Sequence, residues 1–169
     1  MAHPLPSDLS QEKVRELLQY ESDTGRFFWR NDGSEAGTYT LGYRAIRING
    51  RRYFAHRLAW LYVCGRWPRD QIDHIDRDKS NNRIANLREA TASQNRFNRW
   101  VSYKNRSGIR GVRFEPKRKR WRADIRKNGR TLFLGRYETP SEAMAVYARA
   151  AQENSGEFAC NTPSRGAIP

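Results

Sequence analysis

The sequence has few of the features that mark secreted, membrane-spanning or cysteine-rich metal proteins. Its 169 residues include only two cysteines, Cys64 and Cys160, and no CxxC pair, so neither a disulfide framework nor a cysteine-rich zinc site is expected. Uninterrupted apolar stretches such as residues 58–63 are too short to span a bilayer. The N-terminus also lacks the apolar stretch of a signal peptide. These absences predict a soluble protein of a reducing compartment that does not associate with membranes.

Acidic residues are scarce compared with basic ones. Lys and Arg number 32 against 18 Asp and Glu, which gives a net charge of +14. Between Trp100 and Tyr137, thirteen basic residues are opposed only by Glu115 and Asp124. This concentration favours a polyanionic partner, with nucleic acid as the first candidate, while a merely basic, solvated surface is the alternative.

The first half of the chain alternates short helix and strand patterns. The capping residue Ser10 predicts a helix that ends near Tyr20, and Asn49-Gly50 predicts a β-hairpin turn. From Gln71 the pattern is strand, polar loop, strand and helix. The predicted strands cover residues 26–29, 43–48, 51–54, 71–75 and 84–89. Helices are predicted at residues 55–64 and 92–101, the polar loop at 76–82 and a linker at 102–107.

The second half has the pattern of a three-stranded sheet followed by one amphipathic helix. The strands are predicted at residues 109–114, 120–126 and 131–136. The sequence Thr139-Pro140-Ser141-Glu142 combines a capping box with a proline in the first turn, and Gly156 is placed to end the helix.

The polar residues between Asp73 and Asn95 could carry chemistry. Asp73 and His74 close a predicted strand, Asn86 opens the next strand, and Asn95 lies in the first turn of the following helix. Carboxylate and amide oxygens suit a hard divalent ion, and a neutral imidazole can take a proton from water. The alternative is that Asp and Asn serve as turn residues and that the histidine is only accommodated. Since adjacent strand residues face opposite sides, Asp73 and His74 can reach one phosphate only if the strand ends or bends there.

The segment IDHIDRDKSNNRIANLREATASQNRFN closely resembles the HNH (ββα-metal) endonucleases, particularly the phage and intron homing types. The stretches YESDTGRFFW and AHRLAWLYVCGRWP are similar to the same group. This resemblance implies that His74 is the general base, that Asp73 and Asn95 are metal ligands, and that Asn86 braces the loop and helps orient the histidine. It implies Mg²⁺ as the expected ion, with Mn²⁺ and Zn²⁺ left open, and a setting in the cytoplasm of a bacterial or phage-infected cell.

Three further residues are candidates for phosphate contacts. His56 stands at the start of a predicted helix, and a structural role is favoured over a phosphate or metal role. Arg96 and Arg99 lie on the predicted catalytic helix, where phosphate contacts and a solvated basic face are equally plausible.

Strict alternation in the second half predicts which sheet face is open. Trp121, Ala123 and Ile125 should pack on the helix. The open face then carries a row of arginines with one acid, an arrangement that can contact base edges, against a solubilising face as the alternative. The residues expected on it are Arg113, Arg120, Arg122, Asp124, Arg126 and Phe133.

Residues 107–161 resemble the AP2 (ethylene-response-type) DNA-binding domain through RGVRF, WRADIR, LGRY and SEAMAVYARAA. That resemblance implies a sheet that lies in the major groove, with Arg110, Arg113, Asp124 and Arg126 at contact positions. The sequence departs from the plant members where they carry tryptophans, and Phe133 occupies one of these sites.

Together these features predict an α+β protein: an HNH nuclease module over residues 1–104, an AP2-like domain over residues 105–161 and a loose tail over residues 162–169. The expected function is metal-dependent cleavage of double-stranded DNA, and a homodimer is expected only if both strands are cut. The alternative is a non-catalytic sequence-specific DNA-binding protein or transcription regulator.

Overall fold

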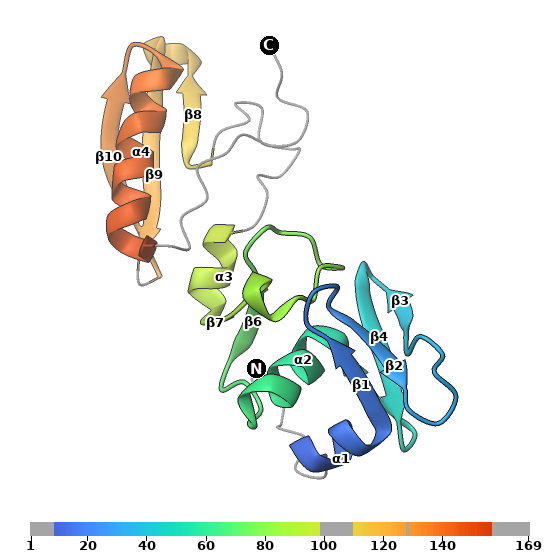
Figure 1. Cartoon of the computed structure of the whole chain (residues 1–169). Helices are drawn as coiled ribbons and strands as arrows, with labels where there is room; N and C mark the ends of the chain where they lie inside the picture. Colours follow the sequence, from blue (N-terminus) through green and yellow to red (C-terminus); the bar gives the residue numbers. More distant parts are fainter. Residues whose placement is uncertain (1–8, 99–109, 128, 157–169) are drawn as a thin grey trace. The chain divides into compact units, whose positions relative to one another are not determined.

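The computed structural model describes residues 9–98, 110–127 and 129–156, which fall into two compact units (Figure 1). The units divide between Asn95 and Arg96. Both combine short helices with small antiparallel sheets, so the architecture is mixed α/β. The predicted boundary between residues 104 and 105 and the predicted tail lie outside the described residues and stay predictions. Within the described ranges, no helix is long and apolar enough to cross a membrane.

The first unit opens with a helix and a hairpin. Helix α1 (Gln11–Leu17) is capped by Ser10, whose hydroxyl accepts a backbone N–H of the first turn at 3.2 Å. The predicted helix end near Tyr20 is wrong, because strand β1 (Leu18–Glu21) pairs antiparallel with β2 (Arg26–Trp29). Pairing with an aromatic strand thus outweighs the helical spacing of the apolar residues.

A second sheet has the strand order β3 (Thr38–Thr40), β4 (Tyr43–Ile48) and β5 (Arg51–Phe54). Asn49 and Gly50 join β4 to β5 with φ values of 48° and 76°. Two positive φ values in succession define the hairpin turn that this dipeptide favours, so the predicted hairpin is confirmed. Strand β3 was not predicted.

Helix α2 follows directly and ends where the sequence indicates. It spans Ala55–Cys64, and Gly65 takes the left-handed conformation with φ 73°. The core of this unit lies among α1, α2 and the strands around them. Its buried residues are Leu9, Val14, Leu18, Phe27, Ala36, Ile46, Ile48, Tyr53, Ala55, Leu58, Ala59, Leu61, Ile72 and Leu87.

The segment that carries the predicted site is a two-stranded sheet followed by a helix. Strand β6 (Gln71–His74) pairs antiparallel with β7 (Leu87–Ala90), and helix α3 covers Ala92–Asn98. The second strand is shorter than predicted, because residues Ile84–Asn86 form the 3₁₀ helix η1. Asn86 therefore ends a helical turn and does not open the strand. The predicted end of the helix near residue 101 lies outside the described residues.

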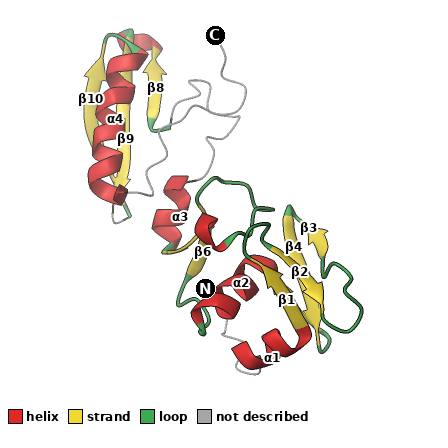
Figure 2. Cartoon of the chain, viewed as in Figure 1, coloured by secondary structure: helices red, strands yellow, loops and turns green. Residues whose placement is uncertain are grey.

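From residue 110 on, the described part of the second unit is a three-stranded sheet followed by a long α-helix (Figure 2). The strand order is β10 (Arg130–Tyr137), β9 (Arg120–Lys127) and β8 (Val112–Glu115), with the 3₁₀ helix η2 (Pro116–Arg118) before β9. Helix α4 (Pro140–Ser155) starts with both hydrogen bonds of the predicted capping box. The buried residues between sheet and helix are Val112, Ala123, Ile125, Ala143, Tyr147 and Ala151.

Candidate active site and nucleic-acid interface

Asp73 and His74 are the last two residues of β6, and both are buried, at 4% and 5% exposure. As expected for neighbours on a strand, their side chains have different surroundings. The carboxylate of Asp73 contacts Arg88 on β7, whereas the imidazole of His74 contacts Asn82 in the loop after β6. The two predicted functional groups thus share a strand end and have separate partners.

Arg88 holds Asp73 through two nitrogens. Its Nε donates to Oδ2 at 2.9 Å, and its Nη2 lies 2.9 Å from the same oxygen. The two residues are direct cross-strand partners in the β6–β7 register. The side chains are 13% and 5% exposed, so this is a largely buried ion pair. Arg88 was not among the residues predicted from the sequence.

Asn82 fixes the imidazole of His74. Its Oδ1 lies 3.1 Å from Nε2 of the ring, and its Nδ2 donates to the carbonyl of Ser80 at 3.2 Å. With the amide nitrogen donating to Ser80, the amide oxygen faces the ring, and this hydrogen-bond arrangement assigns the ring proton to Nε2. The neutral tautomer therefore has its basic lone pair on Nδ1.

The environment of His74 favours the neutral form. Burial lowers the pKa of His74 below its usual value, and this outweighs the opposing effects of the Asn82 hydrogen bond and of Asp76, Asp73 and Asp78. A neutral imidazole at physiological pH can accept a proton from water.

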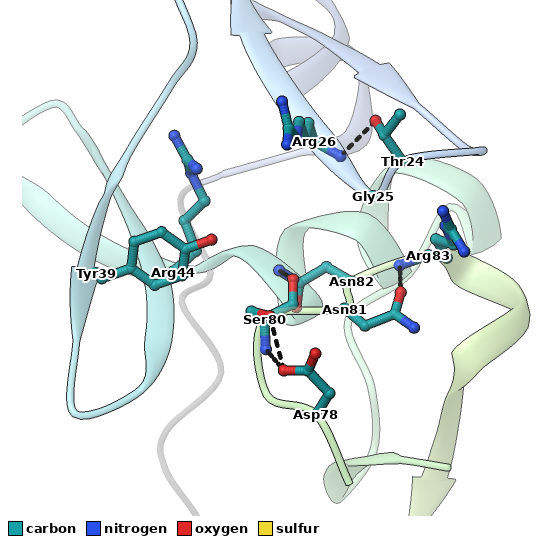
Figure 3. A pocket seen from close by; sticks show the side chains of 10 residues that line it. All are labelled: Thr24, Gly25, Arg26, Tyr39, Arg44, Asp78, Ser80, Asn81, Asn82 and Arg83. Carbon is teal, nitrogen blue, oxygen red and sulfur yellow. Dashed lines mark hydrogen bonds between the residues drawn. The ribbon is translucent and has the colours of Figure 1, made fainter. Parts of the chain in front are cut away.

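The backbone of Asn82 is held from the side of the β1–β2 hairpin. The hydroxyl of Tyr20 donates to the carbonyl of Asn82 at 2.8 Å. A Cβ on Gly25 would lie only 2.5 Å from the carbonyl carbon of Asn82, so this close approach requires glycine at the hairpin turn. Asn82 also lines a polar hollow of about 280 Å³ with Ser80 and Asn81 (Figure 3). The β1–β2 hairpin thus positions Asn82, and Asn82 in turn positions the imidazole of His74.

The side chain of Asn86 makes three hydrogen bonds within the loop after β6. Its Nδ2 donates to Asp76 at 2.9 Å and to the carbonyl of Asn81 at 2.8 Å, and its Oδ1 accepts the backbone N–H of Asp76 at 3.0 Å. The side chain that holds the imidazole, however, is Asn82. The sequence did not distinguish Asn82 from the other polar residues of this loop.

His56 packs against His74. The ring centroids are 5.1 Å apart in an edge-on arrangement, and the ring of Phe54 stacks on His56 at 5.5 Å. Burial, with a smaller contribution from the charge of His74, lowers the pKa of His56 to about 3. An exposure of 8% and a ring that is neutral at physiological pH favour a packing role over a phosphate contact.

Asn95 contacts β6 through Gln71, on the strand face that also carries Asp73. Its Nδ2 donates to Oε1 of Gln71 at 2.7 Å, and Gln71 shares a strand face with Asp73 because the two are two positions apart. The start of α3 is fixed by Thr91, whose hydroxyl accepts from the N–H of Gln94 at 3.2 Å. The side chain of Arg96 and all of Arg99 lie outside the described structure, so their predicted phosphate contacts stay predictions.

The donor set fits a divalent ion that is only partly enclosed by protein. The described residues contain no group of three or more His, Cys, Asp or Glu that could hold a metal. Asp73 offers a carboxylate, and Asn95 offers its amide oxygen because Nδ2 is used by Gln71. Two hard oxygen donors supplemented by a substrate phosphate and water are a usual environment for Mg²⁺.

On the second unit, three arginines form a row across the sheet. Arg113 on β8, Arg122 on β9 and Arg136 on β10 are direct cross-strand partners. The ring of Phe133 is 51% exposed and lies 4.8 Å from the guanidinium of Arg122 and 4.9 Å from that of Arg136. An aromatic ring between two arginines on an open sheet face suits contact with nucleic acid.

The position of Asp124 differs from the expectation of an open-face contact. Its carboxylate is only 7% exposed and lies 2.8 Å from Arg122 and 3.0 Å from Arg113. This acid therefore orients two arginines and has little access to a base edge.

The remaining predicted contact residues are less uniform. Arg120 pairs with Glu138 at 2.5 Å, and Nε of Arg126 donates to the carbonyl of Gly129 at 3.3 Å. Arg110 is half-buried in the turn that precedes β8.

The matched family profile lies almost entirely within the first unit. The sequence profile of the HNH endonuclease family matches residues 53–97, which include Asp73, His74, Asn82, Asn86 and Asn95. An uncharacterized HNH endonuclease of Acanthamoeba polyphaga mimivirus is 38% identical over 106 residues, which are 62% of this chain and 54% of that protein. Protein 3.8 of Escherichia phage T7 is 30% identical over 105 residues, which are 62% of this chain and 86% of the phage protein.

A solved structure of DNA binding and cleavage by the HNH homing endonuclease I-HmuI is similar at 27% identity. The match covers 46% of this chain and 48% of that one, with a TM-score of 0.40. The chain thus spans about half the length of the mimivirus protein and of I-HmuI. The profile match over the β6–β7–α3 segment and the identity to the mimivirus protein show that the chain contains an HNH endonuclease domain.

Proposed function

We propose that this protein is a metal-dependent DNA endonuclease in which His74 acts as the general base. The observation that carries the proposal is the state of His74: it is buried and neutral, and its tautomer is set by Asn82. It also stands next to Asp73 within the segment that matches the HNH endonuclease family. A base of this kind contributes about 10²–10⁴-fold to hydrolysis.

The two neighbours on β6 take complementary roles. Nδ1 of His74 accepts a proton from the water that attacks the phosphorus, while Nε2–H stays bonded to Asn82. Asp73 and Asn95 would hold a divalent ion, with Mg²⁺ proposed. When bound, that ion supplies positive charge to the phosphate and to the leaving 3′ oxygen. Asn86 keeps the intervening loop in place through Asp76.

The second unit is proposed to hold the duplex as an AP2-like reader. The aligned arginines Arg113, Arg122 and Arg136 and the exposed ring of Phe133 support this proposal. Arg120 and Arg126 add positive charge on the same strand. Such a sheet increases affinity through phosphate contacts and adds sequence preference where an arginine reaches a base edge.

Each chain would carry one active site. A monomer is therefore expected to nick one strand, and a double-strand break requires a homodimer or two successive nicks. The viral and phage sources of the relatives favour a setting in an infected cell.

The test is a nicking assay on supercoiled plasmid with and without Mg²⁺, in which the proposal predicts conversion to open circles only with the metal. His74→Ala should abolish nicking and leave the DNA affinity measured in EDTA within a few-fold, because the base acts in the chemical step. A protein that binds plasmid tightly and never nicks it with Mg²⁺ or Mn²⁺ would instead be a non-catalytic DNA-binding protein.

A further inference from the structure

Arg88 neutralises the carboxylate that the proposed function assigns to the metal. Its Nε and Nη2 both lie 2.9 Å from Oδ2 of Asp73, and the strand register places the two residues directly opposite each other. A buried carboxylate without a positive partner is strongly unfavourable. The guanidinium therefore occupies the electrostatic position that a bound cation would take.

A divalent ion at Asp73 would meet a charge imbalance. The ion and Arg88 together bring three positive charges to the carboxylate of Asp73, while Asn95 and Gln71 are neutral amides. The other acids of the loop after β6, Asp76 and Asp78, accept hydrogen bonds from side chains of that loop and of η1. The described residues offer no cluster of three acidic or imidazole side chains that could restore the balance. Because the pair is largely buried, solvent screens the repulsion between guanidinium and metal only weakly. A substrate phosphate would bring further negative charge to this point.

We propose that Arg88 makes divalent-ion binding conditional on a DNA phosphate in the site. Without DNA, the guanidinium opposes the ion at Asp73; with DNA, the phosphodiester balances both cations and gives Arg88 an anionic partner of its own. The inference rests on the proposed nuclease function, whose metal site it concerns. Linkage then requires that the metal raise DNA affinity by the same factor by which DNA raises metal affinity.

The experiment measures Mn²⁺ binding by electron paramagnetic resonance of the free ion. It uses the full-length chain with the His74→Ala substitution, so that bound DNA is not cut. The dissociation constant for Mn²⁺ is determined without DNA and with saturating duplex, after subtraction of Mn²⁺ bound by the duplex alone. DNA is expected to tighten Mn²⁺ binding by roughly 5–150-fold, the usual range of coupling between linked ligands.

Three further variants in this background separate charge from scaffolding. Arg88→Gln should tighten Mn²⁺ binding without DNA by several-fold and shrink the effect of DNA, whereas Arg88→Lys, which keeps the charge, should retain most of the coupling. The matched control is Arg66→Gln, which removes a bidentate pair of 2.9 and 2.7 Å with Glu89, the next residue along β7. This control should change neither dissociation constant. Thermal melts by circular dichroism confirm that each variant is folded.

The inference is overturned if Arg88→Gln weakens Mn²⁺ binding without DNA or leaves it unchanged, because the guanidinium would then only scaffold Asp73. It is also overturned if Arg88→Lys loses the coupling as completely as Arg88→Gln does. A failure of the proposed function itself looks different. In that case Asp73→Asn would leave Mn²⁺ binding unchanged with and without DNA. This result would show that Asp73 is not a metal ligand and would refute the inference as well.

Discussion

Asn82 provides a direct test of the assignment of His74 as the base. The side chain is 1% exposed, and its Oδ1 is the acceptor that places the proton on Nε2. Asn82→Ala removes this acceptor without touching the imidazole. The backbone contact from Tyr20 is unchanged by the substitution, because it ends on the carbonyl of residue 82. The variant therefore changes how His74 is held and leaves the chemistry of the ring itself intact.

The expected effect on the rate follows from the strength of one hydrogen bond. A neutral hydrogen bond contributes about 0.5–1.5 kcal/mol net. If this energy holds the productive tautomer and orientation of His74, its loss lowers kcat by roughly 2- to 13-fold. Stability falls as well, since the Nε2–H becomes a buried donor without its partner, at a cost of about 1–3 kcal/mol. DNA affinity should stay within twofold of the wild type.

A second substitution, Asn82→Asp, places a negative charge opposite the imidazole of His74. Burial lowers the pKa of His74, and a base works only when deprotonated, so activity should rise with pH and reach half its plateau below pH 6.5. In Asn82→Asp, a carboxylate opposite the imidazole favours the charged form and raises the pKa of His74. The acid limb of kcat/KM should therefore move to higher pH than in the wild type.

The assay is single-turnover nicking of supercoiled plasmid at saturating Mg²⁺ between pH 5 and pH 8. Urea titration first establishes the fraction of each variant that is folded, so that loss of rate is not loss of protein. The reasoning about Asn82 is refuted if Asn82→Ala nicks at the wild-type rate, or if Asn82→Asp leaves the acid limb where it was. An equal loss of binding and cutting in a folded variant would also contradict it.

Three other expected outcomes concern the two units separately. Deletion from Ser107 onward should weaken DNA binding, while nicking persists at low salt. The log–log slope of affinity against salt should become shallower by about 0.9 for each phosphate that is no longer neutralised. An unchanged slope would mean that the second unit does not hold DNA. The pKa of His56 is lowered to about 3 in the folded state, so stability present above pH 6.5 should be lost as the pH falls toward 3, and His56→Gln should flatten this loss in urea titrations. Asp124→Asn should release Arg113 and Arg122, and in competition binding it should lower sequence preference more than non-specific affinity. A loss of preference at a single cytosine position would instead show that the acid contacts a base.

Local signals predicted most of the fold. The turn at Asn49-Gly50, the cap at Ser10 and the capping box at Thr139 each depend on a few adjacent residues, and all three form as predicted. The errors occur where distant pairing decides. Helix α1 gives way to β1 at Leu18 because β2 is available as a partner, and β7 is shortened because η1 precedes it. The spacing of apolar residues along a single segment encodes neither the pairing of β1 with β2 nor the 3₁₀ turn before β7.

The candidate site was predictable to the extent that it follows a motif. Asp73 and His74 stand out because they are adjacent polar residues at a strand end, and the structure brings both to the end of β6. Asn82 and Arg88, which hold them, could not be singled out. Asn82 is one of several polar residues in its loop, and its importance arises from the approach of Gly25 across the fold. Arg88 is recognisable only from the β6–β7 register.

The partners of the two β6 residues explain why adjacent groups can differ in chemistry. A carboxylate bonded to His74 would stabilise the imidazolium and make the ring a poor base at neutral pH. Strand alternation prevents this by directing Asp73 to the cation Arg88 and His74 to the neutral amide of Asn82. Asp73 thus faces a cation and His74 faces a neutral amide, which suits the roles of metal ligand and general base proposed for them. Since β6 ends at His74, both side chains lie at the strand end, each with its own partner.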